Sequence, residues 1–169
     1  MTKRIVITGP ESTGKTTLAK QLAKAFHTLW VPEFAREYLE QINRKYQKKD
    51  LLDIAYGQVE KEDQLANLAN EYLFCDTDLI TVKIWSEYKY GDCDERILSL
   101  IEEREYTTYL LCIPDFPWVF DPQRENPSNR AELLQLYRQA LNEYQKSYIE
   151  IQGTPERRFQ MALKHIRNV

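Results

Sequence analysis

Short apolar runs recur along the chain, and each interval between them is long enough to hold a helix. The first, Arg4–Thr8, contains several β-branched residues and is typical of a strand buried on both faces. Similar runs follow at irregular intervals and end at polar or turn-forming residues. The pattern predicts strands at residues 4–8, 28–31, 72–75, 107–113 and 148–151.

The intervening segments repeat apolar residues at helical spacing. In the first of them, 17–26, Leu18, Leu22, Ala25 and Phe26 recur on one side. Gly57 interrupts the longest segment, and glycine costs about 1 kcal/mol relative to alanine inside a helix, so we expect a packing or ligand reason for it. Helices are predicted at residues 17–26, 33–42, 50–70, from after 78 to about 88, 94–103, 131–146 and from 156 onward.

Strands that alternate with helices predict an α/β fold, a five-stranded parallel sheet with helices on both faces. Ligands of such sheets bind at the carboxyl ends of the strands. We therefore expect the loop at 9–16, Glu33, Asp76 and the turn at Asp115 to lie along one edge. No repeat or linker divides residues 1–169, which we interpret as a single domain.

The segment Gly9–Thr16, GPESTGKT, matches the phosphate-binding P-loop pattern G-x-x-x-x-G-K-[ST] between a predicted strand and a predicted helix. Gly9 and Gly14 allow backbone N–H groups to turn inward around phosphate oxygens. Lys15 supplies charge for the β- and γ-phosphates, and the Thr16 hydroxyl suits Mg²⁺. The sequence therefore predicts a P-loop NTPase fold that binds ATP through Gly9, Glu11, Ser12, Thr13, Gly14, Lys15, Thr16 and Thr17.

Composition narrows the class of protein. Hydrophobic residues make up 43% and charged residues 29%, as in ordinary globular proteins, and the net charge of −3 disfavours a general nucleic-acid partner. No apolar run is long enough to span a membrane, and Met1 leads directly into the first strand, which leaves no room for a signal peptide. Cys75, Cys93 and Cys112 form no C-x-x-C pair. We expect Cys75 and Cys112, which lie in apolar runs, to be buried thiols in a reducing, cytoplasmic compartment.

Asp76 ends a predicted strand downstream of the P-loop, where P-loop proteins place a carboxylate for Mg²⁺ or its water shell. Asp76 and Asp78 lie two residues apart and would share a face of an extended segment. One would then serve the metal and the other the hydroxyl of the substrate. Alternatively, Asp78 caps the following helix, and at this stage both interpretations stand.

Arg124 and Arg130 bracket a segment rich in proline and asparagine with little apolar content. We interpret residues 119–131 as a short mobile lid whose arginines close on the transferring phosphate. The alternative is a solvated loop with surface ion pairs.

Five residues are candidates for binding the acceptor of a phosphate group. Glu33 and Arg36 follow the second strand, where Glu33 would hold ribose hydroxyls or orient the attacking one, whereas Arg36 is equally compatible with a helix surface. Trp85 and Trp118 are candidates to sandwich a flat base, and we favour Trp118 because it immediately precedes the lid. Gln58 has the amide needed to read a base edge, unless it lies on the helix surface.

Missing motifs disfavour several classes of P-loop protein. The chain has no N-K-x-D pattern for guanine and no L-S-G-G-Q signature of transporter ATPases, and it is short for a hexameric motor. The remaining small-domain option is a nucleoside or nucleotide kinase.

Six segments together closely resemble the ribosylnicotinamide kinase domain of bacterial NadR-type proteins, and the resemblance covers essentially the whole chain. They are GPESTGKT (9–16), VPEFAREY (31–38), IAYGQ (54–58), CDTDLITVKIWS (75–86), PDFPWVFDPQRENP (114–127) and IQGTPERR (151–158). The resemblance implies phosphorylation of nicotinamide riboside to nicotinamide mononucleotide by ATP and Mg²⁺, in NAD salvage. It also implies a fold similar to nucleoside monophosphate kinases, with adenine held near Gly153 and Pro155.

The P-loop begins at residue 9, so we expect neither an adenylyltransferase nor a DNA-binding region before it. In the expected mechanism, Lys15, Arg124 and Arg130 stabilise the transition-state charge, and Thr16 and Asp76 hold the metal. Two alternatives stay open: a kinase for another nucleoside or nucleotide, and a sensor that binds ATP and signals to a partner. A homo-oligomer is compatible with the sequence; no membrane partner is expected.

Overall fold

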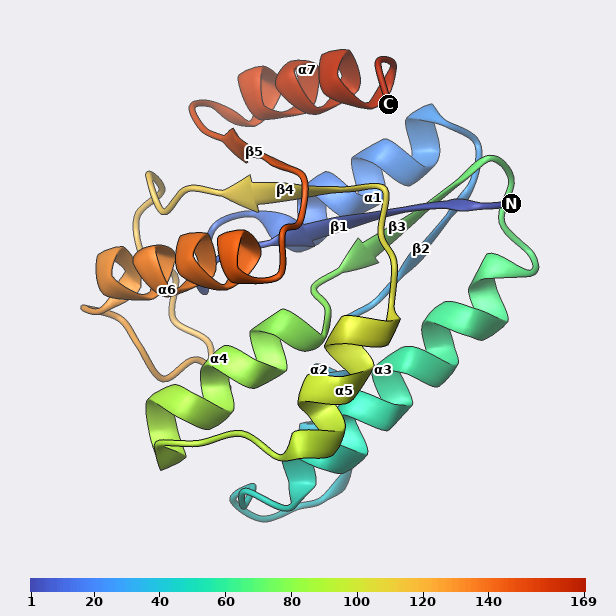
Figure 1. Cartoon of the computed structure of the whole chain (residues 1–169). Helices are drawn as coiled ribbons and strands as arrows, with labels where there is room; N and C mark the ends of the chain where they lie inside the picture. Colours follow the sequence, from blue (N-terminus) through green and yellow to red (C-terminus); the bar gives the residue numbers. More distant parts are fainter.

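The computed structural model describes residues 1–169, and its centre is a sheet in which all neighbouring strands are parallel (Figure 1). The strand order is β2-β3-β1-β4-β5. Each strand lies within one residue of its predicted limits at either end, which confirms the predicted parallel sheet. The bounds are β1 Lys3–Thr8, β2 Leu29–Val31, β3 Tyr72–Asp76, β4 Thr108–Cys112 and β5 Tyr148–Ile151.

Every predicted helix is present, although some end earlier than expected. Helix α3 ends before residue 70 because the amides of Leu68 and Ala69 both donate to the carbonyl of Leu65 and turn the chain. Helix α6 ends before residue 146 because Gln145 adopts a φ of 52°, which no helix continues. The bounds are α1 Lys15–Ala25, α2 Phe34–Gln41, α3 Asp50–Ala66, α4 Leu79–Tyr90, α5 Glu95–Glu103, α6 Arg130–Glu143 and α7 Pro155–Ile166.

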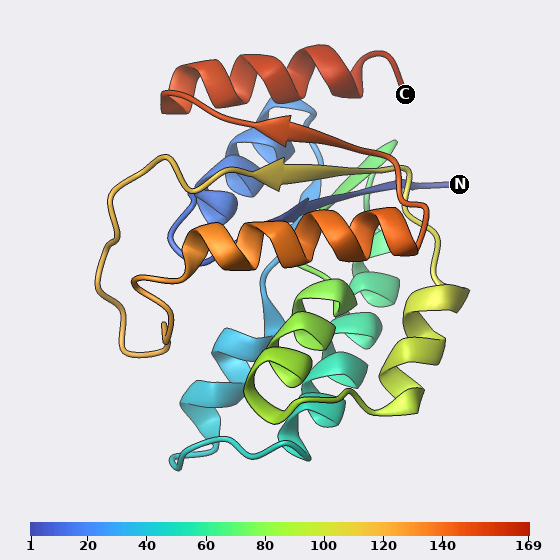
Figure 2. The same ribbon diagram turned by 60° about the vertical axis from the view of Figure 1, so that its left-hand side comes forward.

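The helices form two layers around the sheet (Figures 1 and 2). On one face, α1 and α7 pack against Ile5 and Ile7 of β1. On the other face, Val6 joins a larger cluster with apolar residues of α3, α4, α5 and α6. Because successive side chains of a strand point to opposite faces, the uninterrupted apolar run of β1 serves both layers. No helix combines the length and apolar character needed to cross a membrane.

Gly57 lies inside α3 for a packing reason. A Cβ atom at this position would overlap the ring of Phe34, the first residue of α2. The absent side chain thus lets α2 and α3 approach closely, next to the carboxyl end of β2.

We expect Gly57→Ala to lower the free energy of unfolding by about 1–3 kcal/mol, because the new methyl group must displace an aromatic ring. Urea denaturation followed by circular dichroism measures this loss. The double variant Gly57→Ala/Phe34→Leu removes the ring edge and should recover part of it. If the single variant had the wild-type unfolding midpoint, the close contact would not exist in solution.

The ends of β1, β2 and β3 place the loop at 9–14, Glu33 and Asp76 along the carboxyl edge of the sheet, as predicted. Asp115, beyond β4, pairs with Arg158 and accepts the backbone N–H of Gly153 at 2.6 Å. The long β4–α6 connection stands at this same edge (Figure 2).

Candidate active site

The P-loop owes its shape to residues with left-handed backbone conformations. Gly9, Ser12 and Gly14 have φ values of 134°, 57° and 79°. Gly14 is also the N-cap of α1, so the loop leads directly into the helix amino terminus. Lys15 folds back over the loop and donates a hydrogen bond from Nζ to the carbonyl of Pro10 at 2.8 Å. Backbone N–H groups, the helix terminus and a lysine together form an anion-binding cradle.

Thr16 and Asp76 meet beside the loop. The Thr16 hydroxyl donates to Asp76 Oδ2 at 2.5 Å, whereas Asp76 Oδ1 is buried and has no hydrogen-bond partner. Burial raises the pKa of Asp76, although Thr16 and Lys15 oppose the shift. The orphaned carboxylate oxygen and the neighbouring hydroxyl are the hard donors that Mg²⁺ prefers. The structure contains no group of three or more acidic, histidine or cysteine side chains that could hold a metal, so phosphates and water would complete a metal shell here.

Asp78 points away from this pair. Thr77 adopts a φ of 68° and its amide donates to Ile7, so the segment turns where an extended one was expected. The Asp78 carboxylate accepts the backbone N–H of Ile80 at 3.2 Å and the hydroxyl of Tyr109 at 2.8 Å. Burial raises the pKa of Asp78 to about 7. The prediction that the two aspartates share a face is therefore wrong, and Asp78 caps α4.

Glu33 follows β2 and occupies the N-cap position of α2, yet its side chain makes no capping hydrogen bond. It instead lines a cavity of about 160 Å³ together with the P-loop. Burial and the negative charge of Asp76 raise the pKa of Glu33, while Lys15 and Arg36 act in the opposite direction. A half-buried carboxylate with a raised pKa, facing a phosphate cradle, is suited to accept a proton.

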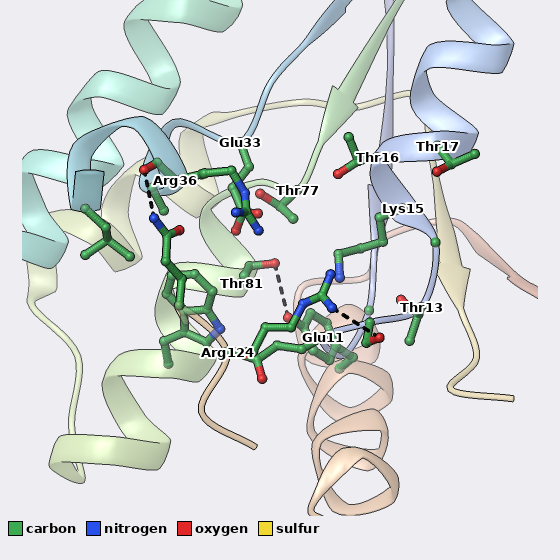
Figure 3. Close-up of a pocket in the computed structure, with 18 residues that line it drawn as sticks. Glu11, Thr13, Lys15, Thr16, Thr17, Glu33, Arg36, Thr77, Thr81 and Arg124 are labelled. Carbon is green, nitrogen blue, oxygen red and sulfur yellow. Dashed lines mark hydrogen bonds between the residues drawn. The ribbon is translucent and has the colours of Figure 1, made fainter. Parts of the chain in front are cut away.

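Three cationic side chains, those of Lys15, Arg36 and Arg124, line the same cavity. Figure 3 shows Lys15 and Arg124 pointing into the same space, with Glu33 and Arg36 across from them. Arg36 also pairs with Asp121 at 2.9 Å, which joins α2 to the 119–131 segment. Arg36 therefore belongs to the cavity rather than to a plain helix surface.

The 119–131 segment is bound to the P-loop along its length. Arg124 donates to Ser12 Oγ at 3.3 Å and to the carbonyl of Val119 at 2.6 Å. The Glu11 carboxylate accepts the backbone N–H groups of Glu125 and Asn126 at 3.2 and 3.1 Å. The segment thus covers the loop, which is the position required of a lid.

Arg130 lies outside the cavity wall. Its guanidinium donates to the carbonyls of Ser12 at 3.1 Å and Phe116 at 2.7 Å. It thereby anchors the start of α6 to the P-loop. Both arginines therefore contact Ser12 of the P-loop, but only Arg124 lines the cavity.

Only one of the two candidate tryptophans lines the cavity. Trp85, on α4, lines the main cavity and an adjacent one of about 410 Å³. Trp118 lines neither and lies instead near Arg124 and Arg130, whose guanidinium carbons are 6.0 and 5.8 Å from its ring centroid. The structure therefore brings Trp85, rather than the favoured Trp118, to the cavity, and base stacking by Trp118 stays a prediction. Trp118 immediately precedes the 119–131 segment, and its ring lies near the two arginines of that segment.

Gln58 is buried and lies outside the main cavity, so it does not belong to the helix surface. Its amide accepts the backbone N–H of Phe34 at 3.0 Å and donates to Glu62 at 3.1 Å. Each end of the amide thus has a partner within the protein, and the residue lines a small pocket beside the main cavity together with Glu33 and Trp85. Its contact with a base edge stays a prediction.

Sequence reasoning missed several residues of this edge. Thr81 lines the cavity one helical turn before Trp85, a spacing of four that the sequence could have indicated. Phe116 was also missed: its ring would lie 3.1 Å from a Cβ at Gly14, and Arg158 lies 4.1 Å above it. Gly153 and Pro155 do not line the main cavity, and their contact with adenine stays a prediction.

Comparison with known proteins places this geometry in a family. A family model described as an AAA domain matches residues 4–158, most of the chain. The chain belongs to this AAA domain family. The family match accords with the P-loop, the parallel sheet and the Thr16–Asp76 pair described above.

The curated relatives of this AAA domain include two proteins named trifunctional NAD biosynthesis/regulator protein NadR. The one from Escherichia coli K12 is 28% identical over 158 residues, covering 89% of this chain and 38% of the relative. The one from Salmonella typhimurium LT2 is 30% identical over 128 residues, covering 72% of this chain and 31% of the relative. The chain therefore spans about a third of the length of these relatives, and the resemblance to NadR-type proteins is confirmed.

Solved structures show the same fold. The crystal structure of a NadR protein in complex with NR superimposes with a TM-score of 0.84 at 21% identity, covering 99% of this chain and 50% of that one. A thymidylate kinase from Ehrlichia chaffeensis gives a TM-score of 0.67 at 11% identity, with 98% of both chains covered. These likenesses confirm the P-loop kinase fold of this AAA domain.

Proposed function

We propose that the protein is an ATP-dependent kinase that phosphorylates nicotinamide riboside to nicotinamide mononucleotide in NAD salvage. The observation that carries this proposal is one cavity that joins a phosphate cradle to Glu33, a carboxylate suited to activate a hydroxyl. The names of the NadR relatives, and the NR bound in a protein of the same fold, support the choice of acceptor.

In the proposed reaction, the P-loop binds the phosphates of ATP, and Lys15 and Arg124 stabilise the charge that spreads over the γ-phosphate oxygens. Thr16 and Asp76 would hold Mg²⁺, which neutralises phosphate charge when bound. These groups supply positioning and electrostatic stabilisation, the two main contributions to phosphoryl transfer.

Glu33 acts on the acceptor. Its carboxylate takes the proton of the primary hydroxyl while that oxygen forms a bond to the γ-phosphorus. The bond from the γ-phosphorus to the β,γ-bridging oxygen breaks, and ADP leaves with the electron pair. Arg36 lies beside Glu33 and favours its ionised form, which is the form that accepts a proton.

The acceptor base stacks on Trp85, which forms a wall between the main cavity and the adjacent one. We expect Trp85→Ala to raise the KM for nicotinamide riboside about ten-fold, the typical loss when a base loses an aromatic partner. Steady-state kinetics at saturating ATP measure this change. Trp118→Ala is the matched control and should leave the KM for the acceptor near its wild-type value; the reverse order of effects would contradict this placement.

The experiment that tests the function is ADP release with ATP and Mg²⁺, with and without nicotinamide riboside, beside a panel of nucleosides and monophosphates. Strong stimulation by nicotinamide riboside, with the mononucleotide as product, is the expected result. Stimulation by another acceptor alone would overturn the choice of substrate. ATP binding without stimulation by any acceptor would identify a sensor instead of a kinase.

A nucleoside monophosphate is a less suitable acceptor. It would require cations for its own phosphate, but Arg36 is paired with Asp121, and Lys89 of the adjacent cavity is paired with Glu125.

We also propose that residues 1–169 act as one kinase domain with 119–131 as its lid. The domain would work in the reducing cytoplasm without nucleic-acid or membrane partners.

A further inference from the structure

Gln58 holds the first amide of helix α2. Its Oε1 accepts the backbone N–H of Phe34 at 3.0 Å, and its side chain is only 3% exposed. The first amides of a helix have no partner within the helix, and a capping side chain commonly satisfies one of them. In α2 the partner comes from another helix, α3, 24 residues further along the chain.

A buried network fixes the orientation of the Gln58 amide. Glu62, fully buried, accepts Gln58 Nε2 at 3.1 Å, and its other oxygen accepts Arg104 at 2.9 Å and Tyr106 at 2.7 Å. An ionised carboxylate only accepts hydrogen bonds, so the NH₂ group must face Glu62 and the carbonyl oxygen must face Phe34. The amide cannot turn over without leaving two buried polar groups unpaired.

Gly57, the neighbour of Gln58, also helps to fix Phe34, through the side chain of Phe34. Gly57 leaves space for the Phe34 ring, while Gln58 bonds the Phe34 backbone. Two consecutive residues of α3 thus define the position of Phe34. Glu33 is the adjacent residue, and its side chain, free of any capping bond, lines the cavity.

We propose that Gln58 is a positioning residue of the kinase, which sets the Glu33 carboxylate toward the acceptor hydroxyl by holding the Phe34 amide. The inference rests on the proposed function of Glu33. Gln58 itself touches neither the phosphate cradle nor the main cavity. Gln58 bonds the first amide of α2 from outside the helix, while the Glu33 carboxylate makes no capping bond and faces the cavity.

The first test is Gln58→Leu, which keeps the approximate size of the side chain but removes the acceptor. We expect kcat to fall about ten- to hundred-fold, because a small displacement of a general base is costly, while the KM for ATP stays unchanged. Gln64→Leu is the matched control: Gln64 lies on the exposed side of α3 and bonds Glu60 at 3.1 Å in the same way, far from Phe34. It should leave kcat at the wild-type value.

Exchange of the two buried side chains provides a rescue. Gln58→Glu places two carboxylates against each other and should lower kcat as Gln58→Leu does. In Gln58→Glu/Glu62→Gln the carboxylate at 58 accepts from both Phe34 and the amide at 62, so kcat should recover most of its value. A kcat that stays at the wild-type value in every folded variant, with only the melting temperature lowered, would overturn the inference.

Crystal structures of the wild type and Gln58→Leu separate this inference from the proposed function. Displacement of the Glu33 carboxylate from the cavity in the variant supports the positioning role, whatever the acceptor. An unmoved Glu33 overturns it. If the wild type failed to phosphorylate nicotinamide riboside, the choice of substrate would fail, and the two structures would still decide the role of Gln58.

Discussion

Lys15→Met is expected to abolish phosphoryl transfer, lowering kcat about a thousand-fold or more, while the fold stays intact. Lys15 is the P-loop cation that points into the main cavity, and its only hydrogen bond to the protein is the one to the carbonyl of Pro10. Its removal therefore costs the transition state a charge but costs the fold little. Formation of nicotinamide mononucleotide measures the rate, and circular dichroism with thermal melting measures the fold.

Lys24→Met is the control for Lys15→Met. Lys24 lies exposed in the last turn of the same helix, far from the cavity, so the substitution should leave the rate unchanged. A Lys15→Met variant with a near-normal rate would remove the P-loop from the reaction and contradict the kinase mechanism.

Glu33→Gln is expected to lower kcat about 10²- to 10⁴-fold, the range for loss of a general base, with little change in the KM for ATP. The amide keeps the shape of the side chain but cannot take the proton of the hydroxyl. Steady-state kinetics with each substrate varied in turn separate the two constants. Glu40→Gln, on the exposed side of the same helix, is the matched control and should retain the wild-type rate.

The pH dependence provides a second readout for Glu33. The base must be ionised to act, and burial together with the charge of Asp76 raises its pKa above the ordinary glutamate value of about 4.3. We therefore expect the rate of the wild type to rise with pH over a range above that value. The residual activity of Glu33→Gln should lack this rise, and an identical profile in both proteins would assign it to another group.

The contribution of Glu33 to the stability of the fold should decrease over the pH range in which the rate rises. A raised pKa means that folded Glu33 retains its proton at pH values where the unfolded chain has released it, so its contribution to stability decreases as the pH rises through this range. Glutamine removes the cost of the buried charge. The melting temperature of Glu33→Gln at pH 8 should therefore equal or exceed that of the wild type, which separates lost catalysis from lost structure.

The sequence allowed the sheet and the P-loop to be predicted because both depend on local patterns. A short apolar run followed by GPESTGKT determines strand, loop and helix within a few residues. The arrangement of Asp76 and Asp78 could not be predicted in this way. It depends on the left-handed conformation of Thr77, which threonine rarely adopts and which no neighbouring residue signals.

Contacts between helices also could not be predicted from the sequence. The role of Gln58 depends on how α3 packs against the start of α2, and the choice between Trp85 and Trp118 depends on which helix face meets the cavity. Gly57 illustrates the limit, because the pattern required a reason for a glycine but only the packing showed that the reason was Phe34.

The placement of the tryptophans provides intrinsic fluorescent probes of ligand binding. Trp85 lines the cavity proposed for the acceptor, Trp118 lies near Arg124 and Arg130 of the proposed lid, and Trp30 is in β2, at the edge of the sheet. We therefore expect the fluorescence of Trp85 to change when the acceptor binds, and that of Trp118 to change when the 119–131 segment moves. Variants that retain one tryptophan at a time would distinguish ligand binding at Trp85 from a change at the proposed lid without any attached dye.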